Sequence, residues 1–230
     1  MKERGMIFNG EMVRAILDGR KTQTRRIISN VGADNCIPLQ KRTKTKDGIY
    51  THVMDANIYG LCPFGKVGDR LWVRETWSDV NLEGAPAVAY RADDEVYDLM
   101  EDESLLDEDG AFNYQDPRVS KYQFAAWYSD LISGVEGNWR PSIHMPRWAS
   151  RILLEITDVR VERLNAITES DASAEGITDT GFGDLLVDGY RYLWKSIYGD
   201  DSWQANPWVW VIEFKVVPNV PANSTGSDIR

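Results

Sequence analysis

The sequence has little cysteine, little histidine and no long apolar run. Its 230 residues include 2 Cys and 2 His. These are too few for a disulfide framework, and Cys36, His52 and Cys62 lack the paired spacing that is typical of a zinc site. No window is long and apolar enough to span a membrane, and residues 1–8 lack the apolar stretch of a signal peptide. These absences predict a cytoplasmic protein with reduced thiols, no metal, no cofactor and no membrane partner.

The sequence also lacks the common catalytic loops and an overall basic charge. It contains no Walker loop, G-x-G-x-x-G, H-E-x-x-H or G-x-S-x-G motif, so it gives no support to the enzyme classes that these motifs mark. The net charge of -10 and a pI near 4.8 argue against tight non-specific binding of long nucleic acid. They do not exclude a local basic cleft that holds one nucleotide.

Positive charge is nevertheless concentrated near the N-terminus, in the segment G-R-K-T-Q-T-R-R at residues 19–26. If residues 20–28 form an ideal strand, the side chains alternate between two faces, with Lys21, Gln23 and Arg25 on one and Thr22, Thr24 and Arg26 on the other. One interpretation is a charged edge strand that resists aggregation. The other is a pocket in which a partly buried Lys21, its pKa lowered by cationic neighbours, takes the proton of a nucleophilic Thr24.

The remaining pattern predicts an α+β, mainly β protein, built as a small barrel or strongly bent sheet with a few helices. Helices are expected at 9–18, 168–175 and 185–198, and extended segments or strands at 20–28, 70–77, 151–164 (with a bulge near Asp158) and 208–217. Residues Thr168–Asp171 resemble a capping box, and Gly176 ends that helix. Segments 29–64 and 79–146 are interpreted as insertions in one domain over 1–217, and 218–230 as a disordered tail.

Two glutamates compete for a place beside Lys21. Glu75 lies in V-R-E-T-W next to Arg74, where a simple salt bridge is the alternative interpretation. Glu175 ends a helix, where the helix dipole disfavours a carboxylate. The one within hydrogen-bond reach of Lys21 is the candidate acid. Trp77 and Trp148, both near turns, are candidates for stacking on a nucleobase.

Five segments, in the order in which they occur, resemble the ASCH family and its long phage and prophage members. They are G-R-K-T-Q-T-R-R, G-D-R-L-W-V-R-E-T-W, L-E-I-T-D-V-R-V-E-R-L, I-T-E-S-D-A-S-A-E-G-I and W-V-W-V-I-E-F-K. The resemblance covers roughly residues 5–28, 65–77 and 147–216, and leaves out the two insertions. It implies the PUA-like fold, a small β-barrel with flanking helices.

The resemblance also implies candidate functions. PUA-like domains are associated with RNA and modified-base recognition. One small bacterial ASCH protein is an amidohydrolase that removes the acetyl group of N4-acetylcytidine, and another member is reported as a ribonuclease. Matched residue by residue, the amidohydrolase's catalytic lysine, threonine and glutamate fall on Lys21, Thr24 and Glu175, and the closing arginine of its motif on Arg26. This chain departs from that enzyme at Gln23 and by its two insertions.

These observations lead to one main hypothesis and three alternatives. The main one is a hydrolase of a modified nucleoside or nucleotide, with Lys21, Thr24 and Glu175 as catalytic residues and an N4-acylated cytidine as substrate. The predicted substrate-binding residues are Arg26, Arg74, Glu75, Trp77 and Trp148. The alternatives are a non-catalytic reader of RNA or modified bases, a metal-dependent ribonuclease, and a phage accessory protein with an interaction role. The oligomeric state and the role of the acidic segment 93–109 stay open.

Overall fold

The computed structural model describes residues 1–28, 40–41, 51–52, 62–178 and 185–219, with backbone alone at 40–41 and 51–52. Most of the first expected insertion, 29–64, lies outside the described residues. So do residues 220–230 of the expected disordered tail. Within the first of these segments, β3 (Gln40–Lys41) pairs antiparallel with β4 (Thr51–His52).

The chain divides into two compact units, and each is described by itself. Unit 1 comprises Met1–Arg4, Ala15–Leu71 and Leu153–Val217, and unit 2 comprises Gly5–Arg14, Trp72–Ile152 and Pro218–Arg230. The expected single domain over 1–217 stays a prediction, since two compact units can belong to one domain.

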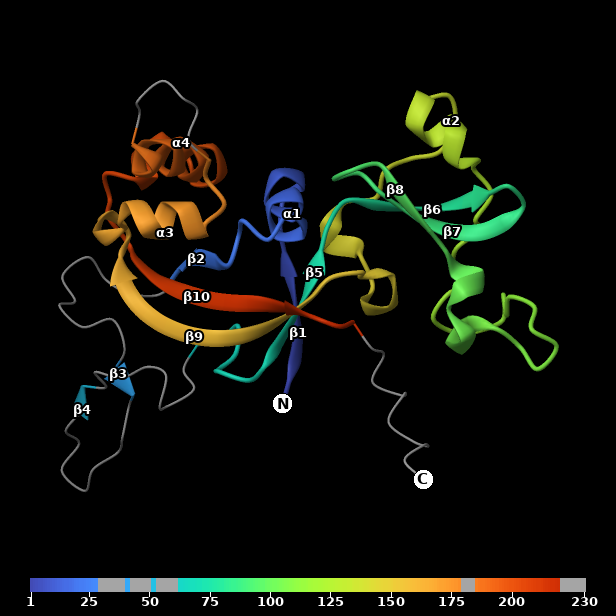
Figure 1. The fold of residues 1–230 in the computed structure, drawn as a ribbon, viewed down its shortest axis with the longest axis horizontal. Helices are drawn as coiled ribbons and strands as arrows, with labels where there is room; N and C mark the ends of the chain where they lie inside the picture. The colour runs from blue at the N-terminus through green and yellow to red at the C-terminus, as the bar shows by residue number, and fades with distance from the viewer. Residues whose placement is uncertain (29–39, 42–50, 53–61, 179–184, 220–230) are drawn as a thin grey trace. The chain divides into compact units, whose positions relative to one another are not determined.

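A five-stranded sheet carries the longest strands of the chain. Its order is β1 (Glu3–Ile7), β5 (Arg70–Arg74), β9 (Leu153–Arg163), β10 (Trp208–Val217) and β2 (Gln23–Ile27). In unit 1, β10 runs antiparallel to both β9 and β2 (Figure 1). Asp158 is opposite Glu213, but Ile156 is opposite Phe214, so Thr157 is the extra residue. This confirms the predicted bulge beside Asp158.

Helices α3 (Glu169–Ala174) and α4 (Leu186–Tyr198) pack on this part of the sheet (Figure 1). Their buried side chains meet those of β10 in one hydrophobic cluster, which includes Leu164, Ile167, Ala172, Tyr190, Trp194, Val209 and Val211. Burial of this apolar surface holds the two helices against the sheet. Helix α1 (Gly10–Leu17) precedes β2 and is capped as expected, because the side chain of Asn9 accepts a hydrogen bond from Met12 N at 2.8 Å.

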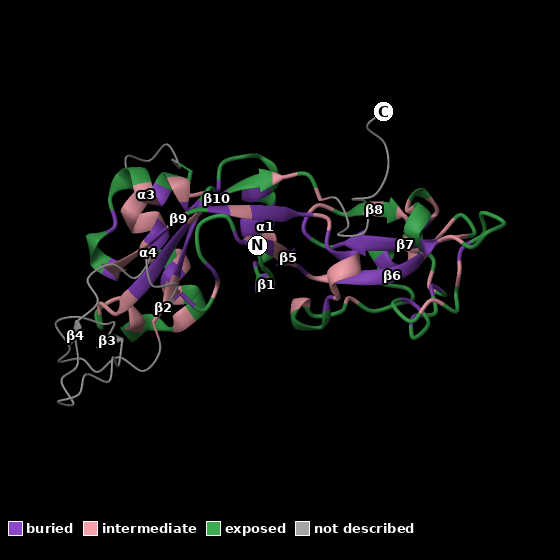
Figure 2. Cartoon of the chain, turned by 90° about the horizontal axis from the view of Figure 1, so that it is seen from below, coloured by how far each residue is buried: buried purple, intermediate pink, exposed green. Residues whose placement is uncertain are grey.

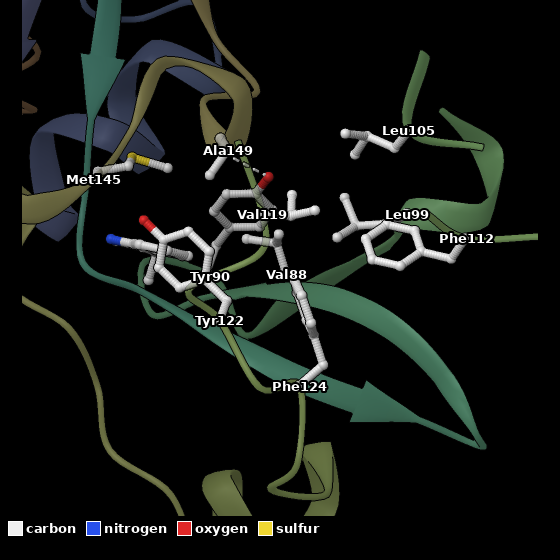
Figure 3. Packing of buried hydrophobic residues seen from close by; sticks show 11 residues of the cluster. Val88, Tyr90, Leu99, Leu105, Phe112, Val119, Tyr122, Phe124, Met145 and Ala149 are labelled. Carbon is white, nitrogen blue, oxygen red and sulfur yellow. Dashed lines mark hydrogen bonds between the residues drawn. The ribbon is translucent and has the colours of Figure 1, made fainter. Parts of the chain in front are cut away.

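Unit 2 contains a second antiparallel sheet, with the order β6 (Trp77–Leu82), β7 (Ala85–Tyr90), β8 (Glu95–Asp98), and the short helix α2 (Tyr128–Ser133). Figure 2 shows β6 and β7 largely buried. Its main core gathers aromatic rings with edge-to-face contacts, and Figure 3 shows Tyr90, Tyr122 and Phe124 among the clustered side chains. Short 3-10 turns at Leu99–Glu101, Glu103–Leu105, Ser142–His144 and Arg147–Ala149 connect the rest.

A five-stranded sheet, a three-stranded sheet, the β3–β4 pair and a few helices confirm the predicted α+β, mainly β class. The PUA-like barrel that the resemblance implies stays a prediction. Across residues 1–28, 62–178 and 185–219, each helix is too short or too polar to cross a lipid bilayer.

The capping box at the start of α3 gives a first testable prediction. The Thr168 hydroxyl accepts from Asp171 N at 3.1 Å, and Asp171 Oδ2 accepts from Thr168 N at 3.0 Å. We expect Thr168→Ala to lower the free energy of unfolding by about 1 kcal/mol, because one helix N–H loses its acceptor. Urea unfolding measures this, with Ser170→Ala in the same helix as control. A Thr168→Ala variant as stable as wild type contradicts the prediction.

Candidate functional site

Lys21 reaches its position through the turn that follows α1. Gly19 adopts a φ of +72°, a left-handed conformation that glycine tolerates without strain. Lys21 N then donates to Ala15 O at 2.8 Å, and Lys21 forms an antiparallel bridge with Glu175, the residue that caps α3 at its C-terminus. Two segments far apart in the sequence therefore meet at these two residues.

The Lys21 ammonium and the Glu175 carboxylate form a buried ion pair. Lys21 Nζ lies 2.6 Å from Glu175 Oε2 and also donates to the Glu175 backbone oxygen at 2.9 Å. The two side chains are 0% and 1% exposed. Burial lowers the pKa of Lys21 below 10.5; Glu175 partly restores it, and the charges of Arg26 and Arg25 lower it further. A lysine in this setting loses its proton more readily than a free one, as a general base requires.

Of the two competing glutamates, Glu175 is therefore the one beside Lys21. The pairing also offsets the unfavourable interaction of the Glu175 carboxylate with the helix dipole, because two cations lie beside it. The second cation is Arg25, whose Nη1 lies 3.4 Å from Glu175 Oε1. Arg25 is absent from the residues that the sequence predicts for the site. Its place on the same strand face as Lys21 was the pattern that could have identified it.

A polar network extends from Arg25 across β9 and α3. Arg25 Nη2 lies 3.3 Å from Glu162 Oε2 and 3.4 Å from Asp171 Oδ1. Burial alone raises the pKa of Asp171, but the hydrogen bonds from Thr168 and the charge of Arg25 bring it down to about 2. Arg160 Nη2 joins the network, 3.1 Å from both Asp171 Oδ1 and Gln23 Oε1. The polar Gln23 is thus part of this network.

Thr24 and Arg26 lie on β2, which begins two residues after Lys21. Thr24 is opposite Ile212 and Arg26 is opposite Trp210 in the β2–β10 register. Thr24 is buried and Arg26 is half-buried. Within the described residues, both hydrogen-bond acceptors of Lys21 Nζ belong to Glu175, and none is the Thr24 hydroxyl. The roles of Thr24 as nucleophile and Arg26 as substrate ligand stay predictions.

Glu75 belongs to a different cluster, in unit 2. Arg151 donates to both of its carboxylate oxygens at 3.0 Å and to both oxygens of Asp93 at 2.8 and 2.9 Å. The same guanidinium stacks 4.1 Å from the centre of the Tyr90 ring. The partner of Glu75 is therefore Arg151, which confirms the salt-bridge interpretation of this glutamate.

Arg74 instead donates hydrogen bonds to backbone carbonyl oxygens of unit 2. Its Nη2 donates to Ile143 O at 2.5 Å and to Met145 O at 3.2 Å, and its guanidinium lies 5.1 Å from the Trp72 ring centre. These contacts give Arg74 a structural role here, and substrate binding by it stays a prediction.

The two tryptophans suggested as stacking platforms differ in exposure. Trp77 is 0% exposed and makes edge-to-face contacts with Tyr122 at 5.3 Å and with Trp148 at 5.9 Å. A base could stack on it only after this core opens, so the structure makes Trp77 a core residue. Trp148 is half-buried in the same cluster and retains some accessible surface.

No group of three or more metal-ligating side chains occurs within the part of the chain that the structure describes. Cys62 is a buried free thiol, and burial raises its pKa. Cys36 and the side chain of His52, the other two members of the zinc set considered above, lie outside the described residues.

A pocket of about 450 Å³ lies in unit 2, lined by Asn9, Gly10, Glu11, Arg14, Thr76, Arg91 and Ala92. It does not include any predicted site residue. One arginine in its wall, Arg14, is already engaged by the carbonyl of Ala92.

Comparisons with known proteins add little to this geometry. No family model matches the chain, and no curated protein matches it. Among solved structures, the chain is similar to protein EF3133 from Enterococcus faecalis, of family DUF984, with 12% identity and a TM-score of 0.37 over 100% of this chain and 87% of that one. A similarity this distant carries no argument about fold or function.

Proposed function

We propose that this protein hydrolyses an acylated amine on a modified nucleoside, with an N4-acylated cytidine as substrate. The observation that carries the proposal is the buried Lys21–Glu175 pair, with 2.6 Å between Nζ and Oε2 and a lowered pKa at Lys21. A desolvated lysine held by a carboxylate is suited to proton transfer at moderate pH. The match of both residues to the ASCH amidohydrolase motif supports the same chemistry.

In the proposed reaction, neutral Lys21 takes the proton of the Thr24 hydroxyl while the Thr24 oxygen attacks the acyl carbonyl carbon. Arg26 stabilises the negative oxygen of the tetrahedral intermediate. The carbon–nitrogen bond then breaks, and Lys21 returns the proton to the amine of the released cytidine. Water finally cleaves the ester on Thr24, releases the carboxylic acid and restores the hydroxyl. Glu175 orients Lys21 throughout. Because the pair is buried, substrate binding must open a path to it.

A non-catalytic role in recognising modified bases is the second candidate. It is favoured by the hydrogen bonds of Lys21, because an activated nucleophile needs its base within hydrogen-bond reach and Thr24 is not bonded to Lys21 here. In this role the same residues would hold a flipped base by its edge.

The test is incubation of N4-acetylcytidine with the wild-type protein, followed by chromatography. We expect release of cytidine, with a rate that rises with pH as Lys21 loses its proton and levels off below pH 10.5, since its pKa is lowered. Arg160→Gln, which removes a neighbouring cation that does not contact Lys21 or Glu175, is the matched control and should keep the activity.

Three outcomes separate the hypotheses. Intact N4-acetylcytidine after incubation excludes hydrolysis of this substrate. If the nucleoside is then retained in equilibrium dialysis, the binding role is supported. Cleavage of RNA that stops on addition of EDTA supports a metal-dependent ribonuclease.

A further inference from the structure

We infer that Arg25 is the positioning residue of this site: its guanidinium fixes the Glu175 carboxylate so that the opposite oxygen faces Lys21. For its effect on a rate, the inference rests on the proposed function. For its effect on Lys21 itself, it rests on the geometry alone. The resemblance assigns no role to Arg25.

The two oxygens of Glu175 are divided between two cations. Lys21 Nζ donates to Oε2 at 2.6 Å, and Arg25 Nη1 donates to Oε1 at 3.4 Å. Lys21 Nζ also reaches the backbone oxygen of the same residue at 2.9 Å. A carboxylate held from both sides cannot rotate freely, so its orientation toward Lys21 is set before any substrate binds.

Arg25 is itself held by two further carboxylates. Its Nη2 lies 3.3 Å from Glu162 on β9 and 3.4 Å from Asp171 on α3, and its side chain is 0% exposed. Asp171 and Glu175 are four residues apart, so they lie on one face of α3 and its C-terminal cap. The guanidinium therefore joins three elements and sets where Glu175 points.

A purely structural role explains this arrangement poorly. Arg25 Nε is buried and has no hydrogen-bond partner within the described residues. An unsatisfied buried donor costs free energy, and apolar side chains of similar volume often stabilise a core at least as well as a buried ion cluster. An arginine that positions a functional carboxylate gives a reason for this cost.

The arrangement has a measurable consequence at Lys21. The charged groups that face Lys21 are Glu175, Arg25 and Arg26, and Tyr190 faces Glu175 from α4. Without Arg25, Lys21 loses a nearby like charge and Glu175 becomes free to pair with Lys21 alone. Both changes favour the protonated amine, so the pKa of Lys21 rises.

The experiment is an NMR pH titration of the full chain labelled with ¹³C-lysine, with the Lys21 resonance assigned from its absence in Lys21→Met. We expect a higher Lys21 pKa in Arg25→Gln than in wild type. The rise should be smaller in Arg25→Lys, which keeps the positive charge but loses the second guanidinium nitrogen that binds Glu162 and Asp171. The matched control is Arg160→Gln. Arg160 also contacts Asp171 and Glu162 but not Glu175, so its removal should leave the pKa of Lys21 unchanged.

An unchanged Lys21 pKa in Arg25→Gln, or an equal rise in Arg160→Gln, overturns the inference. If Arg25→Gln does not fold, the Lys21 pKa is compared between Arg25→Lys and wild type, and an unchanged value overturns the inference. If the hydrolysis exists, Arg25→Gln should also lower kcat near neutral pH by about tenfold or more, with KM little changed. A chain that hydrolyses nothing refutes the proposed function alone, because the titration does not depend on turnover.

Discussion

Lys21→Met is expected to slow the hydrolysis of N4-acetylcytidine strongly and to destabilise the protein. The loss in kcat should be about 10²- to 10⁴-fold, the usual contribution of a positioned base. The free energy of unfolding should fall by about 3–5 kcal/mol, because Glu175 loses a partner at 2.6 Å while its side chain is 1% exposed. Chromatography measures the first effect and urea unfolding the second.

The double variant Lys21→Met/Glu175→Gln separates the two effects. Neutralising Glu175 removes the buried carboxylate that Lys21→Met leaves with Arg25 as its remaining cation, so part of the lost stability should return while the activity stays low. A folded Lys21→Met that still releases cytidine at the wild-type rate would remove Lys21 from the mechanism. The pair would then be a structural ion pair.

Arg151→Met is expected to cause the largest loss of stability in unit 2. Arg151 donates to both oxygens of Glu75, whose side chain is 2% exposed, and it also binds Asp93. Without it, a buried carboxylate has lost its cation, and we expect about 3–5 kcal/mol less free energy of unfolding at neutral pH. The matched control is Arg191→Met, which removes an exposed ion pair at 3.0 Å and should cost at most about 1 kcal/mol.

The cost of Arg151→Met should also depend on pH. Burial raises the pKa of Glu75 above 4.5, and Arg151 opposes this. Without Arg151 the folded-state pKa rises further. A group whose pKa is raised in the folded state stabilises the fold below its unfolded pKa, and this contribution disappears as pH rises through the folded value. Unfolding at pH values below and above 4.5 should therefore show a smaller cost in acid. An equal cost at both would contradict the assignment of the buried charge to Glu75.

The regular elements of unit 1 were predictable from local patterns. The capping box at Thr168, the bulge beside Asp158 and the strand Trp208–Val217 all occur as expected. Each depends on a few neighbouring residues or on alternation along one strand, so the sequence carries the information locally.

The sheet of unit 2 was not predictable in this way. Residues 79–140 show no clean period, yet β6 and β7 form a hairpin there. Four successive residues of β6 and five of β7 are buried. A strand buried on both faces loses the alternation of polar and apolar residues by which a strand is identified.

The partners within the candidate site were only partly predictable. The strand face shared by Lys21 and Arg25 was readable from spacing. The choice of Glu175 over Glu75 was not, since it depends on contacts across 154 residues of sequence. The same limit applies to Glu75 and Arg151, which are 76 residues apart. Nothing in the local sequence of either glutamate encodes such a partner.

That long separation has a consequence for synthesis of the chain. Unit 1 contains segments before and after residues 72–152, and Lys21 and Glu175 are separated by 154 positions in the sequence. Contacts of this range form late in folding, because the chain must close a large loop before they contribute. The ribosome must also have synthesised the chain beyond Glu175 before the ion pair can form. The growing polypeptide therefore carries Lys21 without its Glu175 partner until residue 175 has been synthesised, so the lowered pKa of Lys21 depends on the folded protein.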